Sequence, residues 1–254
     1  MTGLLWLENT YLPPKINRQD VMSSRHTAAS LFAITLLCST TIHAKTPPRL
    51  GAGASFGFGG EYRQLDDGSG DEDMDMSEQE PADMAPSVGA LLQFRYTLID
   101  YVSLGVRPTF LAFRSQAEAD NERKRSYALD TNAFLQLQFE FGAKHNLFYL
   151  GGFGGPAFTF PSKDLKEPVE QLGLELRAGR AWNYGAMIGV NLQGARKDPG
   201  LFIEASYLTQ QVAYNVTGDI TNPFTNESEP VDEKSTGQFW QIGLNVGVTF
   251  ALPN

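Results

Sequence analysis

The sequence predicts an all-β fold, a transmembrane antiparallel up-and-down β-barrel with about eight strands. Three observations predict it. Apolar and polar side chains alternate with a period of two along most of the chain, which is typical of strands with two different faces. Several of these segments exceed about ten residues, whereas strands of globular proteins usually have about 5–6 and membrane-crossing strands need about 9–11. Long and short connections also follow one another in turn, as they do in membrane barrels.

The composition argues against two other classes of protein. Hydrophobic residues make up 42% of the 254 residues, and the mean hydropathy is −0.25. This hydropathy is too low for a membrane protein built from many apolar helices, each of which needs about 20 apolar residues. The formal net charge is −9. Nucleic acid is therefore not an expected partner, because its binding needs a basic surface.

A predicted secretory signal covers residues 22–44. Met22 begins it, Arg25 supplies the positive charge, an apolar run covers 28–42, and Ala44 is the small residue at the expected cleavage site. The apolar run is too short for a membrane-spanning helix. A buried N-terminal helix is the alternative interpretation.

This signal divides the chain into three expected parts. Residues 1–21 are an over-extended N-terminus, 22–44 the signal peptide, and 45–254 the barrel domain. The single cysteine, Cys38, lies in the signal. The mature chain is therefore expected to have no disulfide and no thiol chemistry.

Eight segments carry the period-two pattern, and each is predicted to be a strand. In the sixth segment, the apolar residues at even positions continue toward the N-terminus through Leu172, Leu174, Leu176 and Ala178. We therefore expect this strand to extend beyond the membrane. In the fifth, Pro156 predicts a bulge or a strand end, because proline cannot donate to a ladder. Ten strands remain an alternative count. The predicted segments are 50–64, 88–98, 102–112, 127–141, 147–160, 182–192, 201–208 and 240–250.

The connections between these segments alternate in length. Four long loops are expected at 65–86, 115–125, 161–171 and 212–235, and short turns near 99–100, 143–146 and 195–200. Both chain ends then lie on the side of the short turns. This is the layout of barrels with short periplasmic turns and longer outer loops.

The face that meets lipid is predicted from charge, glycine and aromatic residues. One face carries charged residues in mid-strand, and charge is unfavourable against lipid. We therefore expect Arg95, Arg107, Asp130, Glu140 and Glu204 to point into the lumen and mostly to pair with opposite charges. Glycines on the same face should leave room for these long side chains. The outward aromatic residues are expected to be Tyr62, Tyr96, Phe110, Tyr127, Phe139, Phe141, Tyr184, Tyr207, Trp240 and Phe250. A soluble lipocalin-like barrel with an apolar interior is the alternative.

Residues 239–250, FWQIGLNVGVTF, are the most typical segment of the chain. With the rest of 50–250, they resemble the small outer-membrane β-barrel family of OmpA and OmpX-type barrels. The resemblance implies localisation in the bacterial outer membrane of a Gram-negative cell. It also implies recognition of the terminal aromatic residue, here Phe250, by the barrel-assembly machinery. Residues 251–254 follow that aromatic, where the family usually ends.

No catalytic machinery is evident in the sequence. Hydrolytic barrels need a histidine base, and His145 is the one histidine beyond the signal, in a predicted periplasmic turn. We predict no catalytic, cofactor-binding or metal-binding residues, and hence no enzyme. The glycines at 151–155 lack the lysine of a phosphate loop.

The acidic segment 66–83 leaves one alternative open. Asp71, Asp73 and Asp75 have the spacing of the first ligands of a calcium loop, but Met76 stands where the turn needs glycine. An exposed, solvated loop is the preferred interpretation. A third interpretation lies between the calcium site and the solvated loop. In it, divalent cations loosely bridge the acidic residues to lipopolysaccharide phosphates.

The function expected from these features is a structural, envelope or surface-interaction role through the long outer loops. The alternative is a narrow passive porin in which Arg95, Arg107, Glu140 and Glu204 line a water path. A lipid-modifying enzyme is a third class, disfavoured by the histidine count. The expected partners are outer-membrane lipid and lipopolysaccharide, the barrel-assembly machinery, and a surface ligand of unknown identity.

Overall fold

The computed structural model describes residues 47–65, 81–142, 145–193, 199–221 and 228–252. All of them belong to one compact unit, residues 44–254. The predicted signal at 22–44, residues 1–21 and most of the acidic segment 66–83 lie outside the described residues. Those three assignments therefore stay predictions.

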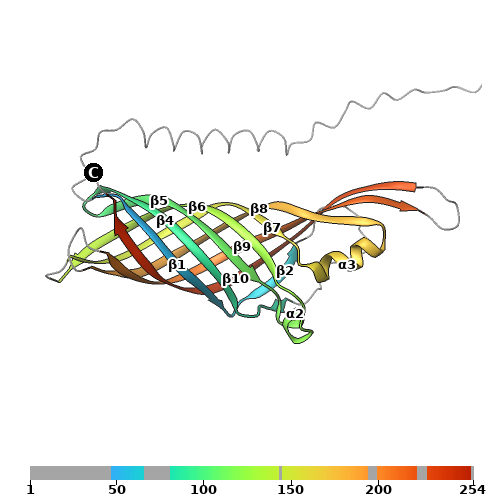
Figure 1. Ribbon diagram of the computed structural model, residues 1–254, viewed down its shortest axis with the longest axis horizontal. Coiled ribbons are helices and arrows are strands. Elements are labelled where there is room, and N and C mark those ends of the chain that lie inside the picture. The colour runs from blue at the N-terminus through green and yellow to red at the C-terminus, as the bar shows by residue number, and fades with distance from the viewer. Residues whose placement is uncertain (1–46, 66–80, 143–144, 194–198, 222–227, 253–254) are drawn as a thin grey trace, which may run out of the picture. The chain divides into compact units, whose positions relative to one another are not determined.

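The described chain forms one antiparallel sheet that closes on itself (Figure 1). Neighbouring strands follow the order β1-β4-β5-β6-β7-β8-β9-β10, and β10 pairs with β1 to close the ring. The ring therefore has eight strands, which confirms the predicted barrel. Its strands are β1 (Arg49–Phe58), β4 (Ser87–Ile99), β5 (Val102–Phe113), β6 (Ser126–Phe141), β7 (Asn146–Phe160), β8 (Leu174–Gln193), β9 (Gly200–Thr221) and β10 (Ser228–Ala251).

The two ends of the barrel differ, and we name them by their connections. At the turn end, β1 begins, β10 ends, and short connections join β4 to β5, β6 to β7 and β8 to β9. At the loop end lie β2 (Glu61–Leu65), β3 (Ala82–Asp83), the two helices and the far ends of β9 and β10. The alternation of short and long connections is therefore as predicted.

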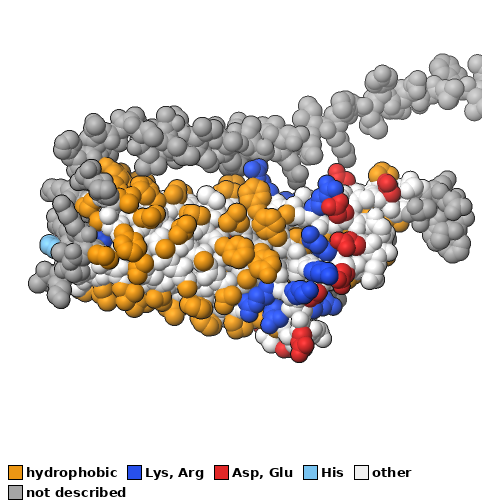
Figure 2. Space-filling view, in the orientation of Figure 1, with side chains coloured by type: hydrophobic (Ala, Val, Ile, Leu, Met, Phe, Trp, Pro, Cys, Tyr) orange, Lys and Arg blue, Asp and Glu red, His pale blue; other side chains and the backbone are white. Residues whose placement is uncertain are grey.

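Every strand of the ring carries exposed apolar side chains, which form a belt between these ends. Figure 2 shows this belt on one face. Leu92, Leu135 and Ile242 are 53%, 56% and 57% exposed, while Ser103, Asp130 and Glu204 on the inward face are 0–1% exposed. The polar face thus points inward and the apolar face outward. This arrangement is the reverse of a soluble barrel and rules out the lipocalin-like alternative.

A glycine pair reverses the side-chain parity of the first predicted strand. Gly59 and Gly60, both with positive φ, separate β1 from β2. Both strands pair with β10, but the register shifts by one residue between them. Tyr62, predicted to point outward, is therefore turned inward and packs against a buried apolar cluster. The prediction was wrong because alternation was carried across a break that only glycine allows here.

A bulge has the same effect in β8. The register with β9 shifts by one residue between Ala178 and Asn183. Leu174 and Leu176, predicted to continue the outward face, are consequently buried inside the barrel, at 9% and 7% exposure. The strand does extend beyond the belt, but its apolar side chains there face a core.

The segment 212–235, predicted as a loop, is mostly a β-hairpin. Strand β9 continues to Thr221 and β10 begins at Ser228, and the two pair without a register shift from Gly200 to Thr221. At Pro156 the structure has neither a bulge nor a strand end. The ladder between β6 and β7 lacks pairs opposite this proline, but its register is unchanged on both sides.

Two short helices occupy connections that were predicted as loops. Helix α2 (Gln116–Asp120) begins with a reciprocal cap, in which Ser115 N–H donates to Glu118 Oε2 at 2.8 Å and Glu118 N–H donates to Ser115 Oγ at 3.3 Å. Helix α3 (Lys163–Gln171) is capped by Ser162, whose Oγ accepts from Leu165 N–H. Leu165 and Val169 of α3 pack against the apolar cluster at the loop end.

Candidate functional site

The lumen of the barrel is divided into layers, and the inward residues of β6 show their order. From the turn end these are Gln138, Gln136, Phe134, Asn132, Asp130, Ala128 and Ser126, all buried. On this strand, polar residues lie in the half at the turn end, aromatic and charged residues lie at mid-barrel, and small residues lie at the loop end, where the lumen has an apolar layer with a pocket.

The mid-barrel layer is organised by one ion pair. Arg107 of β5 donates two hydrogen bonds to Glu204 of β9, each 2.7 Å long. Tyr149 Oη and Asn245 Nδ2 also donate to the Glu204 carboxylate, at 3.1 and 2.8 Å. Gln93 accepts from Arg107 at 3.0 Å. The buried carboxylate is therefore surrounded by donors, which is what makes a buried charge tolerable.

Aromatic rings complete this layer, and glycines on neighbouring strands make room for them. A Cβ atom at Gly105 would lie 2.6 Å from the Phe134 ring, and one at Gly185 would lie 2.5 Å from the Phe153 ring. The guanidinium of Arg107 lies 5.5 Å from the centre of the Phe134 ring and 5.9 Å from that of Phe153. Gly105 and Gly185 thus make room for rings, whereas the prediction had assigned such glycines to long charged side chains.

The five charged residues predicted for the lumen have different surroundings. Arg107 and Glu204 pair as expected. Arg95 and Asp130 are buried in the lumen, but the described residues give neither of them a salt bridge. Glu140 was misplaced: it lies at the turn end, about four-tenths exposed, with His145 Nδ1 at 3.0 Å from its carboxylate. The last inward position of a long strand projects past the ring, which alternation alone does not reveal.

A pocket of about 570 Å³ opens at the loop end. Its volume lies within the range of about 300–1,000 Å³ common for small-molecule sites. Residues of the strand ends, of β3 and of α3 form it, together with the β5–β6 connection. It is lined by Tyr62, Gln64, Ala82, Met84, Phe113, Ser115, Glu118, Asn121, Arg123, Ser126, Leu165, Val169, Leu176, Val212, Tyr214, Val216 and Ser235.

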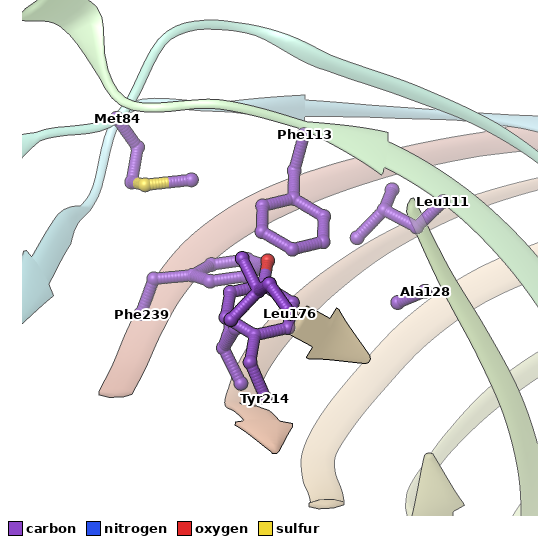
Figure 3. Close-up of a cluster of buried hydrophobic side chains, with 8 residues drawn as sticks. Met84, Leu111, Phe113, Ala128, Leu176, Tyr214 and Phe239 are labelled. Carbon is purple, nitrogen blue, oxygen red and sulfur yellow. The ribbon is translucent and has the colours of Figure 1, made fainter. Parts of the chain in front are cut away.

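The floor of the pocket is apolar (Figure 3). Met84, Phe113, Leu176 and Tyr214 converge there from different strands and connections, and the rings of Phe113 and Phe239 lie 4.9 Å apart. This pocket was not predicted from the sequence. The available signal was the apolar parity of Leu174 and Leu176, which was assigned to the outer face.

The tyrosines of the pocket are uncharged at ordinary pH. Burial raises the pKa of Tyr62 above its ordinary value, and the nearby negative charge of Glu118 adds to the shift. Burial likewise raises the pKa of Tyr214. The charged groups that line the pocket are Glu118 and Arg123, which come from the β5–β6 connection. The arrangement suits an apolar molecule with a polar end.

The closed ring, the inward polar face and the outward apolar belt decide the architecture. The chain has the fold of a bacterial outer-membrane β-barrel. A closed barrel with such a belt is suited to the outer membrane, where each backbone polar group is paired within the sheet. By the layout of such barrels, we expect the turn end to be periplasmic and the loop end to be external.

A solved outer-membrane protein has a similar fold. The crystal structure of the outer membrane protein OprG from Pseudomonas aeruginosa matches with a TM-score of 0.51 and 12% identity, over 84% of this chain and 98% of that chain. The solid-state NMR structure of the outer membrane protein AlkL gives a TM-score of 0.42 and 12% identity, over 85% and 95% of the two chains. Neisserial surface protein A gives 0.37 and 12%, over 81% and 97%.

Sequence comparison adds no family. No family model matches the chain, and no curated protein sequence matches it. The narrower resemblance to OmpA and OmpX-type barrels therefore stays a prediction. Within the described residues, no group of three or more His, Cys, Asp or Glu is placed to hold a metal ion, and no helix is long and apolar enough to cross a membrane. The candidate calcium ligands Asp71, Asp73 and Asp75 lie outside the described residues.

Proposed function

We propose that this barrel is a non-enzymatic outer-membrane protein that binds a small apolar or amphipathic molecule in the pocket at its external end. One observation carries the proposal: an apolar pocket of about 570 Å³ opens away from the membrane-crossing part, above a lumen filled with side chains. This pocket supports a surface-interaction role at that end of the barrel. An apolar molecule entering the pocket gains about 25 cal/mol for each Å² of apolar surface removed from water.

The polar residues of the pocket suggest how a ligand is oriented. Glu118 and Arg123 belong to the β5–β6 connection at the external side, whereas Phe113, Leu176 and Tyr214 form the floor. An amphipathic molecule would place its apolar part on the floor and its polar end toward these charges. We expect this preference because a polar group without partners on the floor would lose its hydration.

The passive porin is the less favoured alternative. Arg107 and Glu204 span the lumen from opposite sides. Around them, Phe134, Tyr149 and Phe202 are each at most 4% exposed. The small cavity beside this layer has about 40 Å³, room for about one or two water molecules. These features favour a plugged barrel with a one-sided site.

The test uses N-phenyl-1-naphthylamine, a probe that fluoresces in apolar surroundings. The mature protein in nanodiscs should give a saturable signal above that of empty nanodiscs. Val216→Trp, which fills the pocket from a half-buried wall position, should remove the saturable part. Val248→Trp, on the exposed lipid-facing side of β10, is the matched control and should keep it. A wild-type signal equal to that of empty nanodiscs, or an unchanged Val216→Trp variant, would contradict the proposal.

A further inference from the structure

Basic side chains gather directly beyond the apolar belt on its external side. Figure 2 shows lysines and arginines in a band at this boundary, with acidic side chains farther out. Two arginines stand at neighbouring strand ends. Phe113 and Ser126 are the last pair of the β5–β6 ladder, so Arg114 and Arg125 follow directly on facing strands. By alternation both point to the outer face.

These two guanidinium groups contact backbone carbonyls rather than carboxylates. Arg114 Nη1 donates to Arg123 O at 2.7 Å. Arg125 Nη1 donates to Pro86 O at 2.8 Å and to Ala112 O at 3.3 Å. Among the described residues neither arginine forms a salt bridge, in contrast to Arg63 with Glu61 and Arg177 with Glu175.

The two positive charges act on each other. Partial burial lowers the pKa of Arg125, and the charge of Arg114 lowers it further. Like charges directly opposite on neighbouring strands are destabilising. A negative group between the two guanidiniums would remove this repulsion, and arginine forks match the oxygens of a phosphate group.

Aromatic side chains fix the depth of the pair in the membrane. The rings of Phe110 and Tyr127 stack at 5.4 Å on the outer face, just inside the two arginines. Arg180 of β8, which is exposed, lies 5.7 Å from the centre of the Phe158 ring, whereas Arg114 and Arg125 are half-buried. Aromatic side chains mark the interface between lipid tails and headgroups. The arginines therefore lie at headgroup level.

We propose that Arg114 and Arg125 form a binding site for the phosphate groups of an anionic lipid of the outer leaflet. The charge of the site is complementary to such a headgroup, and its position at the edge of the apolar belt puts it beside lipid rather than free solute. The site lies on the outer face of the barrel and is independent of the proposed pocket function.

The experiment measures binding of a fluorescent bisphosphorylated glucosamine lipid to the mature protein in neutral detergent micelles. The double variant Arg114→Gln/Arg125→Gln should bind it more weakly, by about 5-fold for each arginine. Arg63→Gln/Arg177→Gln removes the same charge from arginines that are already paired, and should change the affinity little. Arg114→Lys/Arg125→Lys should recover part of the lost affinity, because lysine keeps the positive charge but lacks the paired N–H donors of the guanidinium group. A heat-modifiable band on gels checks that each variant folds.

Each outcome bears on the proposal. Weaker binding confined to the Arg114/Arg125 variants, and reduced by added salt, supports it. Equal losses in the control variant would show a diffuse charge effect and overturn it, as would unchanged binding in the double Gln variant. Displacement of the lipid by inorganic phosphate at equal concentration would show a site for a free anion and would also overturn it. None of these outcomes depends on whether the pocket binds an apolar molecule.

Discussion

Arg107 of β5 and Glu204 of β9 are joined across the lumen by two parallel hydrogen bonds of 2.7 Å. Both side chains are at most 4% exposed. A buried charge that loses its partner costs about 3–5 kcal/mol, although replacing both partners by apolar residues can be nearly neutral. The pair is thus a sensitive point of the barrel.

Glu204→Gln should therefore lower the free energy of unfolding by about 3–5 kcal/mol. Arg107→Met/Glu204→Leu should recover most of that loss, because no unpaired charge remains. Urea-dependent unfolding in lipid vesicles, followed by tryptophan fluorescence, measures both. A loss below about 1 kcal/mol in the single variant would show that water reaches the pair and that the layer is not closed.

The wild-type barrel should not conduct ions steadily. The layer of Arg107, Glu204, Phe134 and Phe202 fills the lumen at mid-barrel. Planar-bilayer recordings of refolded protein should show no stable steps in conductance. Regular, long-lived steps would instead favour the narrow porin, and would require the ion pair to open.

The contact between glycine and an aromatic ring at mid-barrel can be tested by overpacking. Gly185→Leu should destabilise the barrel by about 1–3 kcal/mol or more, because its side chain meets both the Tyr207 carbonyl oxygen and the Phe153 ring. Gly152→Leu is the control, since that position is exposed on the outer face and a Cβ atom meets nothing closer than 3.6 Å. Combining Gly185→Leu with Phe153→Ala should restore part of the stability. Equal effects of the two leucines would contradict the assigned packing.

The acidic segment should be accessible outside the cell. Protease added to intact cells should cut within 66–80 and leave the barrel in the membrane, since acids without bases form no core. Deletion of 68–79 should leave folding intact. Deletion through 83 also removes β3, which pairs with β2, and Ala82, which lines the pocket. It should weaken pocket binding. Cleavage only in permeabilised cells would show that the topology is inverted.

Much of the barrel could be predicted from alternation, because each membrane-crossing strand has lipid on one face and a polar lumen on the other. The errors lie where that contrast ends. Tyr62 and Leu176 face inward because a glycine break and a bulge reverse the side-chain parity. The alternating pattern in the sequence looks continuous across such a break when apolar residues stand on both sides of it. The hairpin of β9 and β10 continues beyond the belt, so its apolar residues Val212, Tyr214 and Val216 face the pocket cluster instead of lipid.

The site was harder to predict than the fold for the same reason. Apolar residues serve two purposes in this chain, toward lipid in the belt and toward the pocket at the external end. Val212 and Tyr214 therefore fell within a predicted loop, although both are buried beside the pocket. The short helix α2 was detectable, since Ser115 and Glu118 have the spacing of a capping box.

The central claim is that an apolar molecule occupies the pocket at the external end. It is tested most directly by NMR of the methyl-labelled mature protein in nanodiscs of deuterated lipid, with 1-octanol added. Intermolecular nuclear Overhauser effects should join octanol protons to the methyl groups of Met84 and Leu176, which are buried at the pocket. Effects confined to Leu92 and Ile188, which are about half exposed on the lipid-facing belt, would mean that octanol dissolves in the membrane alone, and would contradict the account.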